Sequence, residues 1–264
     1  MPDLKIVKSS QGFITQKDLV ETLKNIGINK GDVVCVHSQL LKIGLPLVPK
    51  NKYLHTILEC FFEIIGEKGT LIMPTFTYSF CNNEIYNNLE SKSKVGLLTE
   101  YFRTKWHGVK RTNDPIFSFA IKGAKEKLFL HNTTSCFGDN SVYDVLAKEN
   151  GKIILFGMDN NGLTFSHFIE EKAKVSYRYY KNFSGIIIDH NKKMYESNIN
   201  YYVRKPNVIS YFRVNQIEIL KNNNNFKKEL FGDSCIVSID SKKYLYDTLI
   251  KLKHDERILL KNND

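Results

Sequence analysis

The segment Thr164–Glu170, TFSHFIE, places a histidine and a carboxylate three residues apart shortly after an apolar stretch. Ile153–Phe156 has the pattern of a buried strand, and Thr164 is expected to be the N-cap of a helix. His167 then lies in the first helical turn, where the helix dipole favours neutral imidazole. Glu170 shares its face and is expected to orient the ring. The segment is therefore a candidate general base, with a solvated helix start as the alternative.

Further segments accompany this one in a regular order along the chain. Together with Thr164–Glu170 they resemble the motifs of the aminoglycoside 3-N-acetyltransferase family, and the likeness extends to Lys253–Leu260. The resemblance implies an acetyl-CoA-dependent N-acetyltransferase with that family's own α/β fold. The segments are Val36–Leu40, Gly69–Thr77, Arg111–Ala120 and Phe137–Ser141.

One of these segments departs from the family pattern. Asp114 stands before Pro115 where the family usually has a histidine, and Thr112 replaces a serine. We expect the acceptor site to be remodelled at this point.

In the acetyl-transfer interpretation, the loop after the first buried strand offers backbone N–H groups to the pyrophosphate or pantetheine amides of coenzyme A. A residue at the exit of the next strand contacts the pantetheine arm. The alternatives are an ordinary turn and core packing. The residues assigned to acetyl-CoA are His37, Ser38, Gln39, Leu40, Thr75, Ser118 and Phe119.

The acceptor pocket is expected to have an aromatic wall and two charged residues. Phe76 and Tyr78 supply the wall, although aromatic clusters also build cores. Arg111 is the candidate contact for a phosphate, with pairing to a carboxylate in a surface turn as its alternative. Asp114 completes the predicted substrate residues.

The expected mechanism is direct transfer from acetyl-CoA to a primary amine. His167 takes the amine proton and Glu170 orients the ring. The developing oxyanion needs a donor, for which the Thr164 hydroxyl and the backbone N–H groups near Ser38 and Thr75 are candidates. No metal is expected, because the histidines and cysteines are dispersed and thioester aminolysis needs no Lewis acid.

Charge influences the choice of acceptor. The chain carries 38 Lys+Arg against 28 Asp+Glu, a formal net charge of +10. A basic balance suits anionic ligands, so the first hypothesis is a nucleotide-linked amino sugar for surface-glycan biosynthesis, and the second is an aminoglycoside antibiotic. A nucleic-acid-binding protein is a distant third, because the lysines are spread along the chain and no binding motif occurs.

Composition is that of a cytoplasmic enzyme. Hydrophobic residues make up 42% of 264 residues, yet no apolar run reaches the roughly 20 residues that span a bilayer, and no signal peptide is recognisable. The five scattered cysteines are expected to be reduced. The oligomeric state stays open, with a homodimer among the alternatives.

The order of elements predicts a layered α/β fold in a single domain spanning residues 1–264. An α/β part covers about 1–174 and a β-rich part about 175–264, with loops at strand ends around one cleft. A turn at His190–Lys193 closes a hairpin, and Asn222–Asn225 forms a surface turn. The expected helices are Thr15–Ile26, Tyr53–Ile65, Leu97–Lys105, Ser141–Lys148 and Ser241–Leu252, and the expected strands are Val33–Val36, Thr70–Met73, Phe117–Ile121, Ile153–Phe156, Ser184–Asp189 with a partner from Met194, and Gln216–Leu220.

Overall fold

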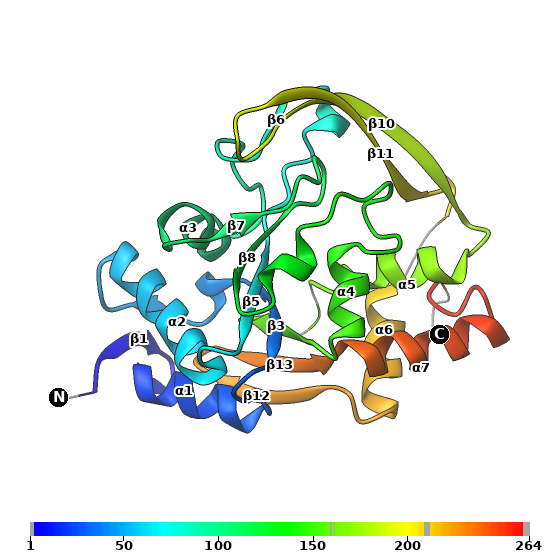
Figure 1. Cartoon of the computed structure of the whole chain (residues 1–264). Coiled ribbons are helices and arrows are strands. Elements are labelled where there is room, and N and C mark those ends of the chain that lie inside the picture. The colour runs from blue at the N-terminus through cyan, green and yellow to red at the C-terminus, as the bar shows by residue number, and fades with distance from the viewer. Residues whose placement is uncertain (1–2, 159, 161, 209–211, 261–264) are drawn as a thin grey trace.

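A seven-stranded sheet lies at the centre of the protein (Figure 1). The computed structural model describes residues 3–158, 160, 162–208 and 212–260. The strand order is β12-β13-β9-β3-β5-β8-β7. Their bounds are β3 (Val33–Ser38), β5 (Thr70–Pro74), β7 (Lys110–Arg111), β8 (Phe119–Gly123), β9 (Lys152–Phe156), β12 (Lys227–Phe231) and β13 (Ser234–Asp240).

Three neighbouring strands of this sheet run parallel. β3 pairs in parallel with β9 and with β5, in registers that set Ser38 opposite Phe156 and Val33 opposite Thr70. The other neighbours pair antiparallel. β3 and β5 are buried almost throughout, which explains their unbroken apolar runs in the sequence. The carboxyl ends of β3, β5 and β9 therefore meet at one edge, where open α/β sheets bind ligands.

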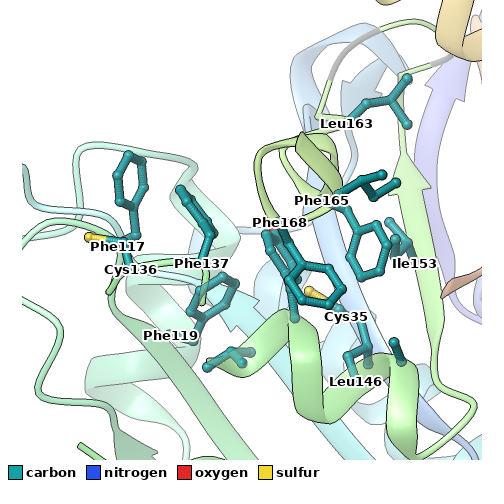
Figure 2. Packing of buried hydrophobic residues seen from close by; sticks show 14 of the residues in the cluster. Cys35, Phe117, Phe119, Cys136, Phe137, Leu146, Ile153, Leu163, Phe165 and Phe168 are labelled. Atoms are coloured by element: carbon teal, nitrogen blue, oxygen red, sulfur yellow. The ribbon is translucent and has the colours of Figure 1, made fainter. Parts of the chain in front are cut away.

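Helices cover both faces of the sheet. They are α1 (Gln16–Asn25), α2 (Lys50–Ile65), α3 (Leu97–Lys105), α4 (Val142–Lys148), α5 (Phe165–Ala173), α6 (Phe212–Asn222) and α7 (Ser241–His254). Residues of α1, α2 and α3 pack with Val34 and Val36 of β3. Cys35 points to the opposite face and joins residues of α4, α5, α6 and α7. Figure 2 shows Cys35 in this second core with Phe165 and Phe168 of α5.

A long hairpin extends from the core (Figure 1). It consists of β10 (Arg178–Ile188) and β11 (Met194–Arg204), which pair antiparallel along their full length. β6 (Tyr86–Asn87) joins β10 in parallel. A separate small sheet and three short 3₁₀ helices complete the described elements: β1 (Lys5–Ser9), β2 (Gly12–Thr15), β4 (Leu45–Pro46), η1 (Leu40–Lys42), η2 (Phe80–Asn82) and η3 (Glu126–Phe129).

The predicted layered α/β fold and the hairpin are confirmed, but one element is wrong. Gln216–Leu220 belongs to helix α6 rather than to a strand. The buried residues Asn215, Gln216, Ile219 and Leu220 follow helical spacing, and Tyr244 donates a hydrogen bond to Gln216. Within the described residues, no helix combines the length and apolar character needed to cross a membrane.

The prediction of a surface turn at Asn222–Asn225 is wrong at its last residue. Asn225 is buried, and its side chain donates to the Asp240 carbonyl while accepting from the Asp240 N–H. Its amide therefore ties the end of α6 to the start of α7.

Gly123 offers a test of how tightly β8 approaches β5. A Cβ at Gly123 would lie 2.2 Å from the Gly69 carbonyl oxygen, whereas a Cβ at Gly12 would meet nothing within 4 Å, and both glycines have positive φ. We expect Gly12→Ala to cost about 1 kcal/mol of unfolding free energy through backbone strain. Gly123→Ala should cost about 3 kcal/mol or more, because backbone must also shift. Urea unfolding measures both, and equal losses would contradict the close contact.

Candidate active site

Glu170 and Arg178 form a buried ion pair between α5 and β10. Arg178 Nη2 lies 2.6 Å from Glu170 Oε2, and both side chains are almost completely inaccessible to solvent. Tyr177 donates from its hydroxyl to Glu170 Oε1 at 3.0 Å. Burial alone would raise the pKa of Glu170, but the nearby His167 and the positive charge of Arg178 outweigh it and lower the pKa to about 2. Glu170 is therefore ionised at neutral pH.

His167 lies against this ion pair. Its Nδ1 is 2.9 Å from Arg178 Nη2 and 3.6 Å from Glu170 Oε2. Burial lowers the pKa of His167, and the neighbouring Glu170 partly opposes that shift. The ring of Phe137 packs 5.5 Å from the imidazole. His167 is therefore neutral at physiological pH, as a general base requires.

Thr164 is held by a tyrosine rather than by a capping bond. Thr164 is the N-cap residue of α5, as predicted, but its backbone is helical and its side chain makes no capping hydrogen bond. Its hydroxyl hydrogen-bonds with the hydroxyl of Tyr143, which also lies 3.3 Å from His37 Nε2. Burial lowers the pKa of His37 to about 4, which keeps that ring neutral. Tyr143 thus connects the ends of β3 and α5.

A cavity opens at the carboxyl ends of the parallel strands. It has a volume of about 200 Å³, and we call it the inner cavity. It brings together five residues that the sequence analysis predicted for the site. They come from β3, from the exit of β5 and from the start of α5. They are His37, Ser38, Phe76, Tyr78 and Thr164.

A larger groove of about 520 Å³ adjoins the inner cavity, since Ser38 and Gly96 line both. We call it the outer groove. Its walls are mostly apolar, with Lys50 among them, and two more predicted residues, Gln39 and Leu40, line it. The backbone N–H of Gln39 already donates to the Phe156 carbonyl at 2.8 Å. That N–H is therefore engaged within the fold rather than offered to a ligand.

Arg111 lies in the interior, not in a surface turn. It is 7% exposed and its Nη2 donates to the Thr75 carbonyl at 2.7 Å. Its Nε lies 3.1 Å from the hydroxyls of Thr75 and Ser118, and its Nη1 donates to the carbonyls of Asn88 and Ser91. Thr75 and Ser118 are fully buried. Arg111, Thr75 and Ser118 therefore connect β7 with the end of β5 and the start of β8, and their polar groups contact one another.

Asp114 and Phe119 lie away from the inner cavity. Asp114 accepts hydrogen bonds from the N–H groups of Ile116 and Phe117 at 2.8 and 2.7 Å, and burial raises its pKa. Both residues line a separate cavity of about 90 Å³. The ring of Phe119 packs 5.2 Å from Tyr143. Asp114 therefore shapes a turn rather than facing His167.

Sequence reasoning missed a hollow of about 410 Å³ whose lining includes Phe137, Asp139 and Glu171, together with Lys172 and Lys174. We call it the acidic hollow. Glu171 is 5% exposed; its Oε1 accepts from Ser135 at 2.6 Å, and its Oε2 has no hydrogen-bond partner among the described residues. Lys172 pairs with Asp139 at the rim. Glu171 is four residues after His167 and shares its helix face.

Arg178, Tyr143 and Glu171 are the site residues that the sequence analysis did not find. Arg178 occurs among tyrosines in an exposed-looking strand, and nothing in one sequence marks it as buried. Glu171 directly follows the predicted Glu170, so helical spacing from His167 was the available signal. Across the described residues, no group of three His, Cys, Asp or Glu side chains is arranged to hold a metal.

Comparisons with known proteins give relatives for this arrangement. The family model for aminoglycoside 3-N-acetyltransferase matches residues 35–245. The chain is 24% identical over 216 residues to an aminoglycoside N(3')-acetyltransferase-like protein from the SPbeta prophage of Bacillus subtilis strain 168, covering 73% of this chain and 77% of that protein. It is 22% identical over 219 residues to aminoglycoside N(3)-acetyltransferase IX of Micromonospora chalcea, covering 74% and 75%.

Solved structures share the fold. AAC-IIIb, in a binary complex with CoASH, matches with a TM-score of 0.79 at 18% identity, covering 91% of this chain and 97% of that chain. The apoenzyme of AAC(3)-IVa matches with a TM-score of 0.77 at 21% identity, covering 94% and 92%. At these identities the likeness concerns the fold, and it confirms the fold class expected from the sequence.

Two adjacent glutamates should change stability with pH in opposite directions. The pKa of Glu170 is lowered from 4.5 to about 2, so its stabilisation is present above pH 4.5 and is lost towards pH 2. The stability advantage of the wild type over Glu170→Gln should therefore shrink as pH falls, by at most about 1.4 kcal/mol per pH unit. Burial raises the pKa of Glu171. The wild type should therefore gain on Glu171→Gln as pH falls towards 4.5. Urea unfolding between pH 7 and 3.5 tests this, and parallel profiles would contradict it.

Proposed function

The chain belongs to the aminoglycoside 3-N-acetyltransferase family, and we propose that, as one N-acetyltransferase domain, it transfers the acetyl group of acetyl-CoA to a primary amine of an aminoglycoside. The observation that carries the proposal is the neutral His167 beside an ionised Glu170, between Thr164, which lines the inner cavity, and Glu171, which lines the acidic hollow. The family match spans this whole region, from residue 35 to residue 245.

The outer groove and the inner cavity suit the acetyl-CoA side of the reaction. Apolar walls fit the pantetheine arm, and Lys50 offers a positive charge for a phosphate. The inner cavity leads to Thr164, which is one helical turn before His167 on α5. A thioester at that end would lie beside the candidate base.

The residues of the site support direct transfer. His167 accepts a proton from the attacking amine, and Glu170 stabilises the imidazolium. The amine nitrogen bonds to the thioester carbon, the carbon–sulfur bond breaks, and the thiolate of coenzyme A takes up a proton. Thr164, whose hydroxyl is fixed by Tyr143, is our candidate donor to the oxyanion. Proton transfer of this kind contributes about 10²–10⁴-fold to the rate.

Burial disfavours a cysteine acetyl-enzyme. Cys35 and Cys136 lie within the second core, and burial raises the pKa of both thiols. Burial also raises the pKa of Cys81, the exposed cysteine. Thiols with raised pKa are poor nucleophiles at neutral pH. The amine therefore attacks acetyl-CoA itself.

Local charge favours an aminoglycoside over the nucleotide-linked sugar that the sequence analysis ranked first. The net charge of +10 favours an anionic acceptor and keeps the nucleotide-linked sugar as the second candidate. However, the acidic hollow contains Glu171, whose Oε2 has no hydrogen-bond partner among the described residues, while Asp139 is paired with Lys172 and Lys174 also lines the hollow. The named relatives are aminoglycoside N-acetyltransferases or resemble them. An unpartnered carboxylate oxygen four residues from His167 offers a contact to an ammonium group, whereas a distant surface charge is screened by salt.

A thiol-release assay with acetyl-CoA tests the acceptor. We expect turnover with aminoglycosides of the gentamicin and kanamycin types, with kcat/KM above about 10⁴ M⁻¹s⁻¹. Raising the salt concentration should increase KM, because screening weakens an ammonium–carboxylate contact. Turnover of nucleotide-linked amino sugars alone would support the second candidate and contradict the first.

Glu171 should contribute to acceptor binding. Replacement by glutamine keeps the shape but removes the charge, so we expect KM for an aminoglycoside to rise about tenfold with little change in kcat. Glu229→Gln, on the exposed surface of β12, is the matched control and should leave KM unchanged. An unchanged KM in Glu171→Gln would remove the acidic hollow from the acceptor site.

A further inference from the structure

Arg178 lies between the candidate base and its carboxylate partner. Its Nη1 donates to the Tyr202 carbonyl at 2.8 Å, which fixes the guanidinium to the hairpin. Its Nη2 is 2.6 Å from Glu170 Oε2 and 2.9 Å from His167 Nδ1. One nitrogen of Arg178 therefore contacts both members of the predicted catalytic pair.

This contact determines where the histidine proton lies. A guanidinium has only donors, so a hydrogen bond with His167 requires Nδ1 to be the acceptor. The proton of the neutral ring is then on Nε2. Glu170 Oε2 is 3.6 Å from Nδ1, which is too far for a hydrogen bond. The ring thus takes the tautomer opposite to that of a histidine oriented by a carboxylate.

We propose that Arg178 is a positioning residue that holds His167 in the Nε2-protonated tautomer in the free protein, and that the base forms when Nδ1 exchanges Arg178 for Glu170. In the free state, Nε2 already bears a proton and Nδ1 is occupied by the guanidinium. In the exchange, Nε2 releases its proton to water and Nδ1 takes one up from water, so that Nδ1–H donates to Glu170 and Nε2 has a lone pair that can accept a proton. The tautomer is independent of the proposed function, whereas its catalytic consequence rests on it.

The charged and titratable groups around His167 agree with this arrangement. They are Glu170 on α5, Arg178 on β10, and Tyr201 and Arg204 on β11. Burial lowers the pKa of His167, Glu170 raises it, and the two arginines lower it further. Removal of Arg178 therefore removes both the donor to Nδ1 and one charge that opposes imidazolium.

The test reads the tautomer directly. The full-length protein is labelled with ¹⁵N-histidine, and long-range ¹H–¹⁵N correlation spectra are recorded without substrates above the pKa of His167. The signals of His167 are assigned as the set of imidazole cross-peaks that is missing from the spectrum of His167→Gln. We expect the wild type to have a protonated Nε2 and an unprotonated Nδ1. A protonated Nδ1 in the wild type would overturn the proposal without any variant of Arg178.

Two variants of Arg178 extend the test. Arg178→Met should convert His167 to the Nδ1-protonated tautomer. In Arg178→Lys, the shorter side chain should pair with Glu170 alone, so His167 should again be protonated on Nδ1. Arg103→Met is the control, because Arg103 also forms a 2.6 Å pair, with Glu100 on α3, that is more exposed than the pair of Arg178. The control should lose less stability and keep the wild-type tautomer. An unchanged tautomer in folded Arg178→Met would contradict the proposal.

Kinetics separate this inference from the proposed function. If the wild type acetylates an aminoglycoside, the acid limb of kcat/KM in Arg178→Met should move to higher pH by about 0.5–1 unit, because a repelling charge is lost. A merely structural role would lower the rate without moving the limb. Failure of the wild type to turn over would contradict the proposed function, whereas the tautomer measurement would stand.

Discussion

The buried ion pair of Glu170 and Arg178 is the interaction on which the site depends. It links α5, which packs on the central sheet, to the β10–β11 hairpin. Burying two charges is costly unless their remaining groups are also hydrogen-bonded. Tyr177 and the Tyr202 carbonyl supply such bonds. Because the pair needs both elements, the hairpin and the helix that bears His167 are held in one arrangement.

The sheet supplies the second constraint. Parallel pairing of β3 with β5 and β9 brings their carboxyl ends to the same edge, and the inner cavity forms there. His37 at the end of β3 and Thr164 at the start of α5 are joined through Tyr143. Thr164, three residues before His167, lines the inner cavity, and Phe137, whose ring packs against His167, lines the acidic hollow. In our proposal, acetyl-CoA and the acceptor reach the base by these two routes.

The fold could be predicted from the sequence further than the site could. Apolar runs indicate the buried strands and helical spacing indicates the helices of the core, because the residues that become buried set these patterns in the sequence. The strand predicted at Gln216–Leu220 was wrong, because the pattern of five residues fits a strand as well as a helix. The helix is favoured by a contact with Tyr244, which comes from a distant segment. The burial of Arg111 and Arg178 could not be predicted for a related reason: an arginine looks exposed in sequence, and its buried partners come from distant segments. Their roles depend on contacts that one chain segment does not reveal.

The central claim is that His167 removes the amine proton beside bound acetyl-CoA. It is tested most directly by single-turnover acetyl transfer to an aminoglycoside in His167→Ala, with acetyl-CoA affinity measured by calorimetry. The account predicts a rate at least about 100-fold below the wild type and a Kd for acetyl-CoA within about twofold, since a general base acts on the chemical step. A rate within a few-fold of the wild type would contradict it.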